Sequence, residues 1–333
     1  MESGIWYLPV TDQRKNELKA WLISINEPAY ELISLNGDAS LRRYFIYGDK
    51  IAVDSPPSSQ KNREFIAINK KLHDAGIYVP QIFAYDLDKG FFLLENLGST
   101  LFADIAKDKE ESFWYEKTVN VLTDLATVAT EDLPPFDRDF ILFELSLFPE
   151  WMLNKAFNLT LDKSDAKMLQ DSFSKLADLC LKQPQIAMHR DFHSRNIMIV
   201  QDKLAVIDYQ DMVKGPITYD LASLLFDCYK VLPQVLIDKI TVKTFASYKK
   251  LNLTEDLSLE GFKRNLEAVS LQRHLKVLGI FCRLNIRDHK NGYLKDLPRV
   301  LNYAINESAL LPGFESLHEF LIKLIPLVKT LCP

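Results

Sequence analysis

Glycine is scarce in this chain, with 11 residues in 333, which is about 3 % against a usual ~7 %. That scarcity disfavours collagen-like, glycine-linker and glycine-rich all-β architectures. Long hydrophobic runs are also missing, because the longest holds only about five residues and a bilayer span needs about 20. The first residues show no basic segment followed by an apolar core, so no signal peptide is indicated. We therefore expect a cytoplasmic protein without a membrane partner.

The chain also has few cysteines and no net positive charge. The four cysteines, Cys180, Cys228, Cys282 and Cys332, form no CxxC pair and lie near no histidine cluster. This spacing disfavours a zinc site or a disulfide framework and predicts buried free thiols. The net charge of −5 gives no electrostatic reason to expect a nucleic-acid partner.

The order of apolar patterns predicts two lobes. In the first third, helices are expected from a Thr11 cap to Asn26 and from Ser58 to about residue 75. Strands are expected over Tyr30–Leu35, Leu41–Tyr47, Lys50–Val53, Gln81–Tyr85 and Phe91–Glu95. The rest is helical in pattern, apart from short runs at 186–188, 197–200 and 204–207. We predict an α+β fold with a small antiparallel β-sheet N-lobe (1–96) and a larger, mostly helical C-lobe (97–333), with a ligand cleft between the lobes.

One segment carries recognisable chemistry, HRDFHSRNIMIVQDKLAVIDYQD, which runs from His189 to Asp211. Its spacing suits phosphoryl transfer, in which Asp191 takes the proton of an acceptor hydroxyl while Asn196 and Asp208 hold Mg²⁺ on nucleotide phosphates. The run IMIVQDKLAVID predicts a hairpin that would bring Asn196 and Asp208 together. Oxygen donors of this kind fit Mg²⁺ better than zinc. A surface loop with chance carboxylates is the alternative, and it would explain a lone HRD but not the whole pattern.

This segment resembles the catalytic region of the aminoglycoside phosphotransferase and choline kinase superfamily, which has a protein-kinase-like fold. More narrowly, the chain resembles the anomeric sugar kinases of peptidoglycan recycling, which phosphorylate N-acetylmuramate and N-acetylglucosamine. The stretches that carry this resemblance are GDASLRRYF, VDSPPSS, HRDFHSRN with IDYQDMVKGPITYDLASLL, and QRHLKVLGIFCRL. The resemblance implies ATP as co-substrate, Mg²⁺ as cofactor and an amino sugar as the small-molecule acceptor. We expect a monomer.

The resemblance also assigns nucleotide binding to the N-lobe. Gly37 and Ser40 flank a short polar run between two predicted strands, where such kinases place a loop over the phosphates, although an ordinary hairpin turn is the alternative. Glu95 and Leu97 in the connector between the lobes would bind adenine through their backbone groups.

The strand that carries the phosphate-pairing lysine in protein kinases has Asp54 in that position. An unpaired Asp54 would repel a triphosphate. Either Arg42, Arg43 or Lys61 supplies the positive charge, with Arg43 our candidate, or Asp54 faces away from the phosphates.

Basic residues gather near the C-terminus. Residues 261–300 hold nine Lys and Arg against three acids, a local charge of +6 that leaves the rest of the chain at −11. If 271–290 is one helix, its basic residues share a face, and Arg283 and Arg287 become candidate acceptor-binding residues. A basic face would repel a polycationic aminoglycoside and suit a carboxylate such as that of N-acetylmuramate. The alternative is a solvated face that balances an acidic body.

Three further residues lie beside the motif. Asp211 could touch the acceptor or support Asp208, while His189 and Asp220 could brace the catalytic loop.

Two other functions stay open at this point. One is a kinase of choline, an aminoglycoside or homoserine; the other is a catalytically dead kinase-like binding module, which only Asp54 supports.

Overall fold

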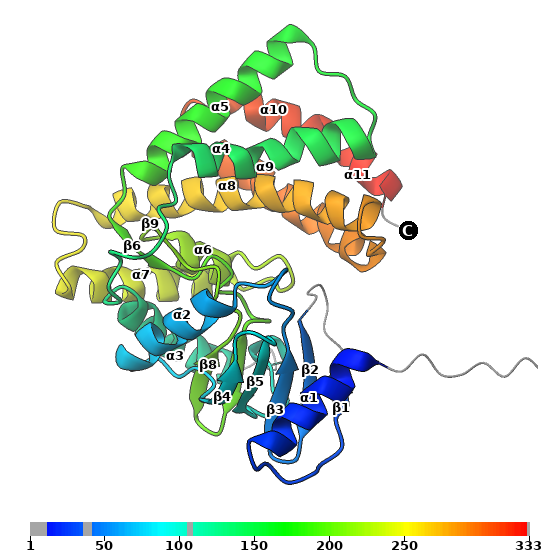
Figure 1. The fold of residues 1–333 in the computed structure, drawn as a ribbon. Coiled ribbons are helices and arrows are strands. Elements are labelled where there is room, and N and C mark those ends of the chain that lie inside the picture. Colours follow the sequence, from blue (N-terminus) through cyan, green and yellow to red (C-terminus); the bar gives the residue numbers. More distant parts are fainter. Residues whose placement is uncertain (1–11, 36–41, 105–108, 332–333) are drawn as a thin grey trace, which may run out of the picture. The chain divides into compact units, whose positions relative to one another are not determined.

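The structure, a computed structural model, describes residues 12–35, 42–104 and 109–331. Its contacts divide the chain into two compact units (Figure 1), unit 1 with Met1–Lys70 and Val79–Ser99 and unit 2 with Lys71–Tyr78 and Thr100–Pro333. Helix α2 (Asn62–Asp74) crosses the boundary between them in sequence. The predicted assignment of nucleotide binding to 1–96 and catalysis to 97–333 stays a prediction.

Unit 1 is built on a five-stranded antiparallel sheet in the order β1-β2-β3-β5-β4. β5 coincides with its predicted run, and the other four strands differ from theirs by one to three residues at one or both ends. The predicted antiparallel sheet is therefore confirmed. The strands are β1 (Ile33–Leu35), β2 (Arg43–Tyr47), β3 (Lys50–Asp54), β4 (Ile82–Asp86) and β5 (Phe91–Glu95).

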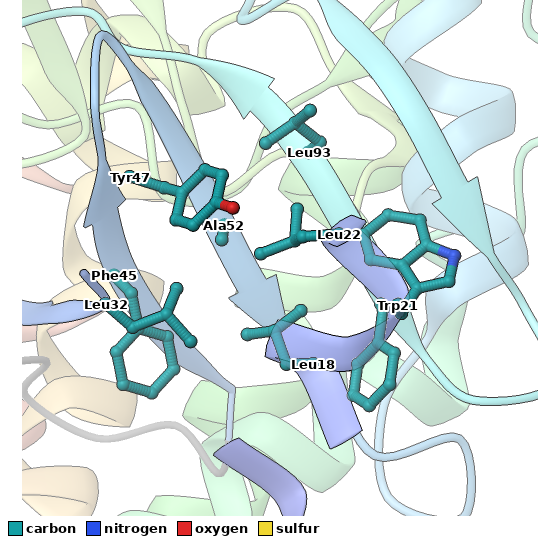
Figure 2. Packing of buried hydrophobic residues seen from close by; sticks show 9 residues of the cluster. Leu18, Trp21, Leu22, Leu32, Phe45, Tyr47, Ala52 and Leu93 are labelled. Carbon is teal, nitrogen blue, oxygen red and sulfur yellow. The ribbon is translucent and has the colours of Figure 1, made fainter. Parts of the chain in front are cut away.

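Helix α1 (Gln13–Ser24) packs its apolar side on this sheet. Figure 2 shows Leu18, Trp21 and Leu22 of α1 against side chains of the sheet and of the segment before it, namely Leu32, Phe45, Tyr47, Ala52 and Leu93. Burying one leucine side chain contributes about 1.5–3 kcal/mol. The predicted Thr11 cap, which lies outside the described residues, is wrong, because the Asp12 carboxylate accepts the Lys15 N–H at 3.1 Å and caps the helix.

Unit 2 is mostly helical, as predicted, and α8 (Leu259–Ile286) is its central helix. Helices α4, α5, α6, α7 and α9 pack against α8 (Figure 1). The short helices η2 and η3 contact it as well. The helices of this unit are η1 (Phe102–Asp104), α3 (Lys109–Leu125), α4 (Arg138–Leu147), η2 (Phe148–Ala156), α5 (Lys163–Leu181), α6 (Tyr219–Leu225), α7 (Gln234–Lys250), α8, η3 (Asn291–Asp296), α9 (Leu297–Leu310), α10 (Glu315–Lys323) and α11 (Ile325–Leu331).

Gly279 allows α8 to cross the helical segment formed by α4 and η2 at very short range. A Cβ atom at this position would overlap the backbone of Leu147, where α4 passes into the π-helix η2. Only a residue without a side chain permits this approach. The close crossing places α4 and its buried Glu144 directly beside α8.

Two short antiparallel strand pairs frame the predicted catalytic segment. β6 (Gln185–Met188) pairs with β9 (Val213–Pro216), and β7 (Ile197–Val200) pairs with β8 (Lys203–Val206). The predicted hairpin is thus confirmed, with Gln201 at φ +54° in its turn. The HRD motif therefore lies in the loop from β6 to β7, and Asp208 follows β8.

Cys180 and Cys228 are buried free thiols, as predicted, Cys282 is buried too, and Cys332 lies outside the described residues. Among the helices that the structure describes, none combines the length and hydropathy of a membrane-spanning segment.

Candidate active site

Two buried carboxylates hold the loop between β6 and β7. Asp220, in the first turn of α6, accepts the N–H groups of His189 at 2.7 Å and Arg190 at 3.0 Å. Asp227 accepts the Ser194 N–H at 3.0 Å and the Tyr229 N–H at 2.7 Å. Burial raises the pKa of Asp220 to about 6, against the lowering effect of His189 and of these N–H donors. Both halves of the loop are thereby fixed to the segment 220–229.

The Arg190 backbone is strained and held by its partners. Its φ is +75°, in the left-handed region, which costs a non-glycine residue about 1–3 kcal/mol. Its guanidinium Nη2 donates to Glu144 of α4 at 2.7 Å, and Glu144 also accepts from Lys276 Nζ at 3.0 Å and Gln272 Nε2 at 3.1 Å. This network joins the catalytic loop to α4 and α8.

Asp191 is an ionised carboxylate with no hydrogen-bond donor assigned to it within the described part of the chain. Burial opposes its charge, but Lys276, His193, Arg190 and Arg273 outweigh burial and lower the pKa of Asp191 to about 2. The carboxylate can therefore accept a hydrogen bond from an incoming hydroxyl group at neutral pH. Positive charge around Asp191 also favours an anionic group close by.

Asn196 and Asp208 lie at the paired ends of the β7–β8 hairpin, where the Ile207 N–H donates to the Asn196 carbonyl at 3.0 Å. The Asn196 Nδ2 donates to the Asp191 carbonyl at 3.0 Å, which leaves the amide Oδ1 to serve as a metal ligand. Asp208 is exposed, has φ +65°, and accepts from Gln210 Nε2 at 2.8 Å.

This donor set fits Mg²⁺, which binds through one or two protein oxygens together with substrate phosphates and water. Within the residues described, no group of three or more His, Cys, Asp or Glu side chains could hold a metal without a substrate. Metal binding by Asn196 and Asp208 stays a prediction that this geometry allows.

His189 links the start of the loop to the strand that precedes Asp208. Its Nε2 lies 3.0 Å from the Ile207 carbonyl, and its Nδ1 accepts the Asp191 N–H at 3.3 Å. Asp211 follows Asp208 by three residues, and Gln210 Nε2, which donates to Asp208, is within 3.5 Å of the Asp211 Oδ2. A role for Asp211 in touching the acceptor or supporting Asp208 stays a prediction.

Asp54 in unit 1 is neutralised by two arginines. It accepts from Arg43 Nη2 at 2.6 Å and from Arg14 Nε at 2.8 Å, while Arg43 also pairs with Asp12. Sequence reasoning missed Arg14, because it lies 40 residues away on α1. Since both carboxylates engage the Arg43 guanidinium, its nucleotide-binding role stays a prediction.

The other nucleotide-binding candidates are Gly37, Ser40, Glu95 and Leu97. Gly37 and Ser40 fall outside the described residues. Glu95 ends β5, with its N–H donating to the Gln81 carbonyl at 2.9 Å, and Leu97 is buried. Their contact with adenine stays a prediction.

The expected single basic face on 271–290 is wrong. Arg273 and Lys276 are buried, Arg283 is half-buried, and α8 ends before Arg287. Arg287 is exposed and pairs with its neighbour Asp288 at 2.7 Å. The basic residues therefore differ in burial and in their charged neighbours. Arg273 and Lys276, the two buried ones, act on Asp191 of the catalytic loop.

His274 provides a pH-dependent link between α8 and the segment that holds the loop. Its Nδ1 lies 2.9 Å from Glu307, and its Nε2 lies 3.0 Å from the carbonyl of Phe226, which precedes Asp227. Burial disfavours the charged ring, but Glu307 outweighs burial and raises the pKa of His274 to about 10.

Because the folded-state pKa exceeds the ordinary value of 6.5, the charged His274 stabilises the fold fully below pH 6.5, and this contribution disappears as the pH rises through 10. We expect His274→Gln to cost most free energy of unfolding near pH 6 and progressively less toward pH 10. Urea unfolding of both proteins across this range measures the difference. A cost that stays constant with pH would contradict the charged pair.

Comparison with known proteins agrees with this arrangement. The model of the phosphotransferase enzyme family (APH) matches residues 31–245. The N-acetylmuramate/N-acetylglucosamine kinase of Pseudomonas putida is 33 % identical over 90 % of this chain and 93 % of its own length. The protein of the same name from Neisseria meningitidis is 32 % identical, over 94 % and 96 %.

Solved structures share the fold at low sequence identity. A GDP complex of aminoglycoside 2'-phosphotransferase-IIIa has a TM-score of 0.62 at 14 % identity and covers 89 % of this chain and 99 % of its own. Choline kinase LicA from Streptococcus pneumoniae has a TM-score of 0.57 at 16 % identity, over 88 % and 99 %. The predicted kinase-like fold is therefore confirmed.

Proposed function

Because this chain belongs to the phosphotransferase enzyme family, we propose that it is an ATP- and Mg²⁺-dependent kinase that phosphorylates the anomeric hydroxyl of N-acetylmuramate and N-acetylglucosamine. Membership makes the chain a phosphotransferase with a nucleotide and a small molecule as substrates. The choice of acceptor rests on relatives that carry the name of this activity and align with nearly the whole chain.

The observation that supports this function best is the state of Asp191. Its carboxylate is ionised, has no donor assigned to it among the described residues, and lies on a loop held at both halves by buried acids. Such a group can orient an acceptor hydroxyl toward the phosphate and take up its proton as the new bond forms. An anomeric hydroxyl is more acidic than an ordinary alcohol, which eases that proton transfer.

Asn196 and Asp208 would hold Mg²⁺, since their oxygen atoms flank one end of a rigid hairpin. When bound, the ion neutralises negative charge on the transferred phosphoryl group. The protein's own part is to present Asp208 in its left-handed conformation beside Gln210 and to fix Asn196 against the Asp191 carbonyl.

A choline or aminoglycoside acceptor is the second candidate, because enzymes with these substrates share the fold. The charge around Asp191 speaks against it, since Arg190, Arg273 and Lys276 all act on this carboxylate. Glu144 pairs with Arg190 and Lys276, so the charge of Arg273 remains to repel a quaternary amine or a polyamine. A binding module without activity receives little support, because Asp54 is paired with two arginines and thus no longer repels a nucleotide.

Product analysis tests the proposal. The protein is incubated with ATP, MgCl₂ and one acceptor at a time: N-acetylmuramate, N-acetylglucosamine, choline or kanamycin. Phosphorus NMR should show, for the two sugars only, a phosphate coupled to the anomeric proton. A phosphate at another hydroxyl, or turnover with the amines alone, would overturn the proposal. Absence of turnover together with absence of Mg²⁺-dependent stabilisation by an ATP analogue would favour the inactive module.

A further inference from the structure

Arg273 is a buried cation that forms no ion pair with the residues that the structure describes. Its side chain lies in the middle of α8 and is only 3 % exposed. Its Nε and Nη1 atoms are enclosed and have no hydrogen-bond partner, and no ion pair to it is found within the described segments. Removing a charged group from water is costly unless another group compensates it. A buried guanidinium without hydrogen-bond partners at Nε and Nη1 therefore indicates a bound group that supplies them.

The neighbouring cation on α8, Lys276, has partners on other helices. Lys276, one turn along α8, lies 3.0 Å from Glu144 and 3.2 Å from the Tyr219 hydroxyl. Both cations lie near the Tyr219 ring, with the Arg273 Cζ 5.6 Å and the Lys276 Nζ 5.9 Å from its centroid. The two positive charges thus share one environment, and of the two only Lys276 forms an ion pair with a carboxylate among the described residues.

The position of Arg273 places it beside the catalytic loop. Tyr219 precedes Asp220, which binds the N–H groups of His189 and Arg190, and Asp191 is the next residue. Electrostatic interaction with Arg273 also lowers the pKa of Asp191. By contrast, Arg283 lies ten residues further along α8, about 15 Å away along the helix axis, and the charges that act on it are those of Arg287, Asp288 and Glu150.

We propose that Arg273 is the specificity residue of the acceptor site and binds the carboxylate of an acidic sugar whose reactive hydroxyl contacts Asp191. This inference rests on the proposed function, in which one acceptor, N-acetylmuramate, carries a lactyl carboxylate and the other, N-acetylglucosamine, does not. A guanidinium matches a carboxylate in charge and in the geometry of two parallel N–H donors. The neutral sugar would leave Arg273 unpaired, so Arg273 would contribute to the binding of the acidic acceptor only.

The test is Arg273→Met, which keeps an unbranched apolar stem and removes the guanidinium and its charge. We expect KM for N-acetylmuramate to rise about 10- to 100-fold, as the loss of hydrogen bonds to a charged group predicts. KM for N-acetylglucosamine and kcat for both sugars should change less than threefold. The matched control is Arg138→Met on α4, a half-exposed arginine paired with Asp178, which should change neither KM.

A second, independent test uses the wild-type protein with a modified sugar. N-acetylmuramate with its carboxylate converted to a carboxamide should bind about as poorly to the wild type as the acid binds to Arg273→Met, and calorimetry measures both. Equal affinity of the wild type for acid and amide would overturn the inference even if the variant does not fold. A fall in kcat for both sugars would instead assign Arg273 to the phosphoryl group and also overturn it. Absence of sugar phosphorylation by the wild type would refute the proposed function itself.

Discussion

Asp191→Asn is expected to lower kcat by about 10²–10⁴, because the variant keeps the shape of the side chain and loses the group that accepts the proton. Since the pKa of Asp191 is about 2, its carboxylate is ionised throughout the neutral range and needs no deprotonation before it acts. ATP affinity should change little, because the loop and its anchors Asp220 and Asp227 stay in place. Steady-state turnover and nucleotide titration measure the two effects separately.

A suitable control for this variant is Asp202→Asn, an exposed acid in the turn of the β7–β8 hairpin. It removes the same charge from the same segment without touching the loop, so turnover should remain at the wild-type level. Near-normal turnover in Asp191→Asn would remove Asp191 from its proposed role, and an equal loss in both variants would attribute the effect to charge alone.

Glu144→Gln is expected to destabilise the fold by about 3–5 kcal/mol, the usual cost of removing one partner from a buried ion pair. Glu144 is 3 % exposed and is the carboxylate that both Arg190 and Lys276 contact. The amide would still accept one hydrogen bond, but its NH₂ group would face a second donor. Urea or guanidinium unfolding at pH 7 measures the loss.

The pH dependence of this loss has a defined sign. Burial opposes the charge of Glu144, but Lys276 and Arg190 outweigh burial and lower the pKa of this carboxyl group. Its contribution is therefore fully present above the ordinary value of 4.5 and is lost as the pH falls below it. The cost of Glu144→Gln should shrink in acid.

Glu116→Gln on α3 is the matched control for Glu144→Gln. Glu116 also pairs with two cations, Lys239 and Lys243, but it is 31 % exposed. Surface pairs of this kind contribute about 0–1 kcal/mol. A similar cost for the two substitutions would show that burial of the Glu144 network adds nothing.

The catalytic segment could be predicted from sequence because its information is local. Two short apolar runs on both sides of a short polar turn specify the β7–β8 hairpin, and pairing within it brings Asn196 next to Ile207. The strands of unit 1 were predictable for the same reason, and β5 matches its predicted run at both ends. In each case, a few neighbouring residues determine the structure.

What could not be predicted depends on residues far apart in the chain. The helical pattern of 271–290 predicted one basic face, for an acceptor carboxylate or for solvent, because nothing near Lys276 in sequence indicates that Glu144 lies beside it. Likewise, the charge of Asp54 appeared uncompensated because Arg14 belongs to another element. Long-range ion pairs follow from packing, and hydropathy periodicity alone does not contain them.

The central position of α8 has a consequence for anyone who wishes to change which molecule the protein phosphorylates. Gln272 and Lys276 bind Glu144, His274 binds Glu307 and the Phe226 carbonyl, and Gly279 admits the backbone at Leu147. Random mutagenesis of this helix would mostly yield unfolded protein. A directed library that varies position 273 alone, and keeps the other residues of α8 unchanged, would retain the fold while variants are tested on new substrates.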